Sequence, residues 1–202
     1  MHNSLALFNS NIRQAREISA LYDYLVASVA VPQQFDDLLR SQLVYSVSAF
    51  DKLIHDLVRI GMVQSFMGVR TPTGKYLSEP VSMQVHNEMV QATIPPKEHV
   101  FEQALFRKFK TISFQDPVKV ADGLSYIWDE SQKWQKIAAL LGISDPAART
   151  RLKLIADRRN AIVHEADIDP STNTKFAIGK AESEGSLNFL EACGNAIANL
   201  VT

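Results

Sequence analysis

The sequence predicts an all-α fold, an up-down helical bundle with additional helices. Apolar residues recur every three or four positions in each strongly patterned segment, which is the spacing of one face of an α-helix. The alternation of apolar and polar residues that marks strands does not persist, and no internal repeat is present. Helices joined by short connections pack as neighbours, so we expect one domain over residues 1–202.

The first two expected helices have the clearest periodicity. One spans about Asn11 to Val29 and ends at Pro32, because proline lacks the N–H that continues a helix. The second spans about Gln33 to Gly61, and its inward positions are Leu39, Leu43, Val47, Phe50, Ile54 and Leu57. Beside that stripe runs a polar ridge, formed by Ser48, Asp51, Lys52 and His55.

Residues 69–96 are expected to form an insertion of loop and short helix within the domain. Three residues that disfavour helices, Pro72, Gly74 and Pro80, indicate a loop over residues 69–80. A short helix over about residues 81–92 follows and ends before Pro95.

Five more helices are expected from about residue 97 onward. One covers about residues 97–112, another starts at Pro117, and Trp128 to Leu141 carry a further one to a C-cap at Gly142. Asp145 and Pro146 suit the N-cap and first turn of the next helix. Residues 169–173 indicate a turn, and residues 183–201 the closing helix.

The composition indicates a globular protein of the reducing cytosol. Hydrophobic residues make up 46% of the chain and charged residues 21%, which argues against disorder. The single cysteine, Cys193, is expected to pack as a small hydrophobic residue. No apolar run approaches the roughly 20 residues that span a bilayer, and the N-terminus lacks a secretion signal. We therefore expect a soluble, cytoplasmic protein with no membrane partner.

The net charge of -1 conceals a local excess of cations in the last third of the chain. Five of them lie between positions 149 and 159, against the single acid Asp157: Arg149, Arg151, Lys153, Arg158 and Arg159. Nucleic-acid binding leaves such a footprint even in a neutral protein. The alternative is an ordinary solvated helix face.

The sequence Arg159-Asn160-Ala161-Ile162-Val163-His164 sets a cation, an amide and an imidazole within two turns of one expected helix. Arg159 falls inside that helix's apolar stripe, which consists of Leu152, Ile155, Ile162 and Val163. Burying an unpaired guanidinium costs several kcal/mol, so Arg159 needs a carboxylate, a phosphate or a partner chain. Asn160 and His164 are i,i+4 neighbours on the flank of the stripe.

Together, Arg159-Asn160-x-x-x-His164 in a late helix and the segment Ser46 to Val58 in an early one resemble the HEPN superfamily, most closely its RiboL-PSP and MAE-type prokaryotic members. The resemblance implies an all-helical dimer. It also implies a metal-independent endoribonuclease of toxin–antitoxin or phage-defence systems, with RNA and a cognate antitoxin or defence-system protein as partners. Some members of the superfamily have lost catalysis and only bind nucleotides or partner proteins, and that alternative stays open here.

Chemically, these side chains suit cleavage of RNA without a metal or other cofactor. The imidazole of His164 can accept the proton of a 2′-hydroxyl or protonate the leaving 5′-oxygen. Arg159 would neutralise charge on the phosphorane, and Asn160 would orient the phosphate or the imidazole. The ridge residues Ser48, Asp51 and His55 would support Arg159 or tune His164.

One histidine per motif leaves either the acid or the base missing. A two-fold dimer would bring two motif helices, and so two histidines, to one basic cleft. We expect the apolar stripe around Arg159 to form part of that interface.

Other interpretations compete with this chemistry. Arg159 could pair with Asp51 as a structural bridge while His164 caps its helix. Asp167 and Asp169 lack the further ligands of a calcium loop, so the residues after the motif are expected to be solvated, and no metal site is predicted. Some HEPN toxins carry a tyrosine two residues after the motif histidine as the target of an adenylylating antitoxin. Ala166 stands there in this chain, which argues against such a partner.

Overall fold

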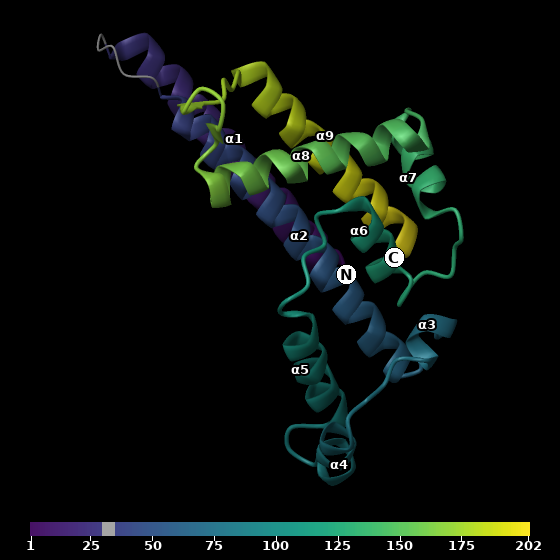
Figure 1. The fold of residues 1–202 in the computed structure, drawn as a ribbon. Coiled ribbons are helices and arrows are strands. Elements are labelled where there is room, and N and C mark those ends of the chain that lie inside the picture. The colour runs from purple at the N-terminus through teal and green to yellow at the C-terminus, as the bar shows by residue number, and fades with distance from the viewer. Residues whose placement is uncertain (30–34) are drawn as a thin grey trace.

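The computed structural model describes residues 1–29 and 35–202, and it confirms the all-α prediction. Three long helices pack side by side as the centre of the fold (Figure 1): α1 (His2–Ser28), α2 (Asp36–Phe66) and α9 (Lys180–Val201). A buried amide joins them. Gln42 on α2 donates to the carbonyl of Ala15 on α1 at 3.0 Å and accepts from the hydroxyl of Ser183 on α9 at 2.6 Å.

The central helices are longer than the sequence indicated. α1 begins at His2 instead of Asn11. Before Asn11 its buried positions are Ser4 and Phe8, and the polar serine hides the apolar periodicity there. α2 continues through Gly61 to Phe66, since a Cβ at Gly61 would lie 2.5 Å from Ile127 and the glycine permits close packing. The expected boundaries at Pro32 and Gln33 lie outside the described residues.

Residues 69–96 lie at one end of the molecule (Figure 1). They contain the one-turn helix α3 (Gly74–Leu77), inside the segment expected to be a loop, and α4 (Met83–Gln91), where the short helix is expected. α4 buries none of its own residues and packs on α5 (Lys97–Phe109), which in turn lies against α2.

The expected helix up to Gly142 is shorter than Trp128 to Leu141. α6 (Pro117–Leu124) ends before Trp128, and α7 (Lys133–Leu141) begins after it, so Trp128 lies in the connection. Trp134 is a core residue whose indole N–H donates to the carbonyl of Pro117 at 2.8 Å. Gly142 is the predicted C-cap, with a φ of 67°.

Helix α8 (Asp145–Glu165) carries the motif and crosses α2 (Figure 1). Its N-cap is Ser144, whose hydroxyl accepts from the N–H of Ala147, so the cap lies one residue before the expected Asp145. Leu152 and Ile155 are buried inside the protomer, whereas Val163 is 44% exposed. Within the stripe, Val163 is thus the residue exposed enough to contact a second copy, and the expected dimer interface stays a prediction.

One hydrophobic core contains residues of α1, α2, α5, α6, α7, α8 and α9. Cys193 lies within it, and burial raises the pKa of its thiol to about 12. Among the described residues, no helix is long and apolar enough to cross a membrane.

The chain reverses direction directly after α8. Ala166 and Asp167 both have left-handed backbones, with φ of 53° and 59°, and the N–H of Asp167 closes onto the carbonyl of Ala161. A short antiparallel hairpin follows, β1 (Ile168–Asp169) with β2 (Thr174–Lys175), around the predicted turn. Left-handed residues other than glycine cost free energy, so the reversal requires an anchor.

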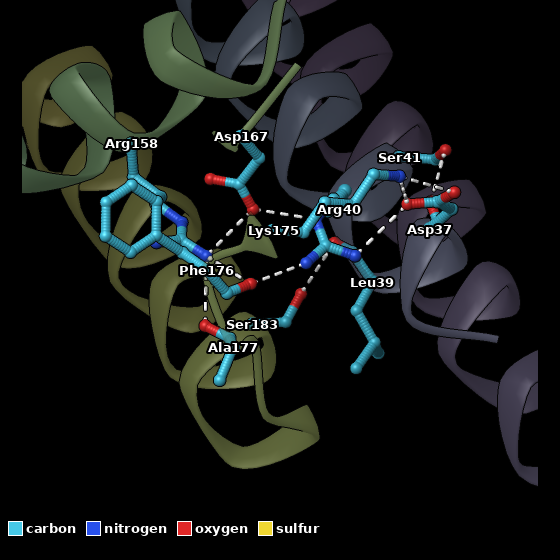
Figure 2. Close-up of polar contacts among 10 residues, drawn as sticks. All are labelled: Asp37, Leu39, Arg40, Ser41, Arg158, Asp167, Lys175, Phe176, Ala177 and Ser183. Atoms are coloured by element: carbon cyan, nitrogen blue, oxygen red, sulfur yellow. Dashed lines mark hydrogen bonds and ion pairs between the residues drawn. The ribbon is translucent and has the colours of Figure 1, made fainter. Parts of the chain in front are cut away.

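Asp167 is that anchor, and the expectation that it is solvated is wrong: its side chain is fully buried. Figure 2 shows the carboxylate between two arginines. Nε of Arg40 on α2 lies 2.7 Å from Oδ2, and Nη2 of Arg158 on α8 lies 2.9 Å from the same oxygen. Both guanidinium groups also donate to backbone carbonyls of the segment before α9, those of Phe176 and Ala177. The carboxylate and its two arginines thus join α2, α8, the reversal after α8 and the segment before α9.

Replacing Asp167 with alanine should destabilise the protein by about 3–5 kcal/mol, because Arg40 would stay buried without its main partner. The matched control is Asp37→Ala, which removes a second carboxylate from the same arginine. Asp37 is 69% exposed, so its loss should cost about 1 kcal/mol or less. Urea unfolding followed by circular dichroism measures both values. Equal losses would show that burial does not set the strength of these pairs.

Candidate functional site

Arg159 lies half-buried on the side of α8 that faces α2. Its Nη1 donates to the side-chain oxygen of the adjacent Asn160 at 3.1 Å, and its Nε is buried without a hydrogen-bond partner. No carboxylate among the described residues lies within 4 Å of its guanidinium nitrogens. The arginine is therefore under-satisfied in the protein alone, and an external anion could complete it.

Next to Arg159 is a cavity of about 300 Å³ between α2, α5 and the connection that follows α5. The three ridge residues predicted to support Arg159 line it together with Arg159 itself. The full lining consists of Ser48, Asp51, Lys52, His55, Asp56, Arg59, Leu105, Phe106, Phe109, Lys110, Gln115 and Arg159. Residues that are distant in sequence thus form one polar recess with an apolar floor.

Asp51 and His55 are held by the connection between α5 and α6. The carboxylate of Asp51 accepts from the backbone N–H of Phe114, and Nε2 of His55 lies 3.0 Å from the carbonyl oxygen of Ile112. A carbonyl can only accept, so Nε2 carries a proton and Nδ1 is the nitrogen left to accept one. The His55 ring also packs edge-on against Phe114, with centroids 4.6 Å apart.

Burial raises the pKa of Asp51 above its ordinary value. The nearby His55, the N–H of Phe114, the charge of Arg159 and a hydrogen bond from Gln115 oppose this rise without cancelling it. A close ion pair would instead lower the pKa. No nitrogen of Arg159 lies within 4 Å of a carboxylate oxygen of Asp51, so in the described chain the two do not form the structural bridge of the alternative interpretation.

Asn160 and His164 are exposed on the outer side of α8. At about 100° per residue, they share this side with Arg149 and Lys153. His164 is not among the residues that line the cavity beside Arg159. Within one chain, the motif thus presents its arginine to the recess and its histidine to the surface.

Comparison with known protein families identifies the chain. The sequence model of the family RiboL-PSP-HEPN matches residues 9–202. The chain belongs to this HEPN family. Comparisons with curated proteins and with solved structures give no match.

The cations near the HEPN motif lie on two sides of α8. On the outer side, Arg149 pairs with Asp145 at 2.7 Å and Lys153 with Asp157 at 3.3 Å, both one turn away. On the side toward α9, Arg151 donates to the carbonyl of Gly185 and stacks over Phe189. Arg158 is bound to Asp167. Arg149 and Lys153 are thus the two that share the outer side of α8 with His164, although they lie 15 and 11 residues before it in the helix.

Seven of the residues that line this site in the HEPN protein are not marked as site residues by the sequence pattern: Asp56, Arg59, Leu105, Phe106, Phe109, Lys110 and Gln115. Phe106 lines the cavity yet is 60% exposed, and Gln115 lies on its wall. A signal for Phe106 exists, because it is an aromatic residue on the charged face of the amphipathic helix α5. No local pattern marks Gln115. The described residues contain no cluster of three or more His, Cys, Asp or Glu that could hold a metal ion.

The raised pKa of Asp51 predicts how stability depends on pH. Between the ordinary value of 3.8 and the raised folded value, the folded protein binds more protons than the unfolded chain. Stability therefore falls through this window as the pH rises. Asp51→Asn removes this proton binding. As the pH rises from 3 to 7, the stability of the variant should therefore increase relative to that of wild type. Urea unfolding at several pH values measures the difference. If the stability of wild type instead increases relative to that of the variant as the pH rises, Asp51 forms a close ion pair with Arg159 or His55.

Proposed function

We propose that this HEPN protein is a metal-independent endoribonuclease whose active site is completed by a symmetric dimer. The observation that carries the proposal is the guanidinium of Arg159, which lacks a carboxylate partner in the described chain and borders a polar cavity. An arginine held in this state is suited to bind a phosphate, since its fork of N–H donors matches phosphate oxygens. RNA binding and dimerisation are both common among HEPN domains.

In the proposed reaction, one imidazole removes the proton of an RNA 2′-hydroxyl, and the 2′-oxygen forms a bond to phosphorus. The bond from phosphorus to the 5′-oxygen breaks, and a second imidazole, in its protonated form, gives its proton to that oxygen. The products are a 2′,3′-cyclic phosphate and a 5′-hydroxyl. Arg159 stabilises the added charge on phosphorus, and Asn160 orients the phosphate or the imidazole.

A dimer supplies the second imidazole. His164 is exposed on the outer side of α8, so two copies that face each other through this side would bring two His164 residues together. Arg149 and Lys153 lie on the same side, each in an ion pair at the surface with an acid one turn away; such pairs are weak, so RNA phosphates in the shared cleft could replace the acids. Arg151 and Arg158, proposed with them from the sequence, have internal partners and would contribute less.

The biological role that fits such an activity is that of a toxin or defence effector in the cytoplasm, restrained by an antitoxin or triggered by a defence-system protein. Growth arrest on expression, relieved by His164→Ala, would support this role. The second candidate function is a HEPN module that binds a nucleotide or a partner protein without cleaving RNA. The separation of His164 from the Arg159 cavity within one protomer favours that alternative.

Purified protein incubated with total RNA in EDTA should produce 2′,3′-cyclic phosphate ends. His164→Ala should lower cleavage at least about 100-fold, because acid–base catalysis typically contributes that much. Its stability should change by no more than about 0.5 kcal/mol, since the side chain is exposed. Arg159→Ala should lower cleavage by a similar factor without loss of stability.

The matched controls are His86→Ala and Arg13→Ala, which remove an exposed histidine and an exposed arginine from other helices. Both should cleave RNA as wild type does. If neither wild type nor the controls produce cyclic phosphate ends, the protein is the non-catalytic module. Unchanged cleavage by His164→Ala would remove that histidine from the mechanism.

Mixed dimers test the shared site. Co-expression of His164→Ala with wild type should yield heterodimers with one imidazole, and their turnover should fall well below half that of wild type if acid and base come from different subunits. Differently tagged chains allow the heterodimer to be isolated and assayed. Turnover at half the wild-type value, or cleavage by a chain that sediments as a monomer, would contradict the shared site.

A further inference from the structure

We propose that the cavity beside Arg159 is a subsite for one unstacked nucleotide of a single-stranded RNA, and that Phe106 on α5 is the surface on which its base stacks. The inference rests on the proposed function, because it takes Arg159 as the group that holds the adjoining phosphate. It adds residues of α2 and α5 that lie outside the motif, and it defines the form of RNA that the site accepts.

The size of the cavity suits a single nucleotide. Its volume of about 300 Å³ is at the lower end of the range of about 300–1,000 Å³ that small-molecule sites occupy. The floor is apolar, since Leu105 and Phe109 are only 4% exposed. A recess with an apolar floor and polar walls can take a flat base below and a ribose and phosphate at its rim.

The charges at the cavity favour a phosphate. Four cations and two carboxylates line it. Of the cations, Lys52 and Arg59 both bind Asp56, at 2.9 and 3.0 Å. Neither Lys110 nor Arg159 has a carboxylate within 4 Å in the part of the chain that the structure describes. Lys110 at the end of α5 and Arg159 on α8 are thus the two cations best placed to bind an anion.

Phe106 supplies the stacking surface. Its side chain lines the cavity and is 60% exposed, although its neighbours Leu105 and Phe109 are buried in the core. An exposed phenylalanine gains free energy when a base covers it, and such stacking accepts any base because each has a flat π face. The next aromatic residue, Phe109, lies below as part of the floor.

These features favour single-stranded RNA over a duplex. In a duplex each base is stacked between its neighbours, whereas a base that enters a recess must be unstacked, as in loops and free ends. A peptide is less well matched, because the exposed ring and the two cations that have no carboxylate partner among the described residues fit a phosphate joined to a flat base. Cleavage would then fall beside the nucleotide that the recess holds.

Binding measured without cleavage tests the subsite. The probe is a fluorescent oligonucleotide of 2′-O-methyl uridine, which has no 2′-hydroxyl and stays intact, with anisotropy as the readout in EDTA. Phe106→Ala should weaken its binding about 5-fold to 150-fold, the range expected for loss of one stacked base. Phe106→Tyr should restore it, because the ring is kept. Lys110→Ala should weaken binding and reduce its salt dependence.

The control is Tyr24→Ala, which removes an aromatic residue that is 66% exposed near the end of α1, and it should bind as wild type does. A duplex of the same length should bind equally to wild type and Phe106→Ala. Uridine monophosphate should compete with the oligonucleotide, and more weakly against Phe106→Ala.

Each outcome separates this inference from the proposed function. If Phe106→Ala binds the oligonucleotide as tightly as wild type while Arg159→Ala does not, the subsite is wrong and the ribonuclease proposal stands. If Phe106→Ala binds the oligonucleotide as tightly as wild type but cleaves no RNA, the ring has a role other than stacking, and the inference fails. The same holds if the variant binds the oligonucleotide tightly but no longer binds a protein partner of the wild type. Weak binding by Phe106→Ala in a protein that never cleaves RNA would keep the subsite and overturn the ribonuclease.

Discussion

The buried pairing of Asp167 with Arg40 and Arg158 determines where the motif helix ends. Two consecutive left-handed residues turn the chain away at Ala166 and Asp167, and a conformation of that kind persists only when its surroundings hold it. The carboxylate bonds to α2 through Arg40 and back to α8 through Arg158, and both arginines reach the segment that leads to α9. The last turn of α8, and with it His164, is thereby fixed relative to α2, which supplies the opposite wall of the site.

Most of the fold could be predicted from the sequence, because periodic burial dominates it. The stripe of α2 and the C-cap of α7 follow from side-chain spacing and from one glycine with positive φ. The errors occur where a residue type has a second use. Gly61 suggested a helix end but allows Ile127 to approach, and Ser4 is polar but faces inward in the first turn of α1. Such uses depend on the neighbouring element, which a local pattern does not contain.

The candidate site could be predicted only in part, and for a similar reason. The i,i+4 spacing placed Asp51 and His55 on one face, and the apolar stripe of α8 directed Arg159 toward it. The sequence could not distinguish a cation that is free from one that is paired within the chain. Arg158 and Arg159 are adjacent and chemically identical, yet one binds a buried carboxylate and the other lacks one among the described residues. A count of the cations along a helix thus overestimates how many of them are free to bind a nucleic acid.

The buried thiol described in the core has a practical consequence. Cys193 has no exposed surface and a pKa of about 12, so its thiolate is scarce at neutral pH and out of reach of maleimides and methanethiosulfonates. Reagents that modify thiols should therefore react very little with the wild-type chain. A cysteine placed at a chosen position on the outer side of α8 would carry the only reactive sulfur. A spin label attached there would report the separation of two copies in solution without any change to the core.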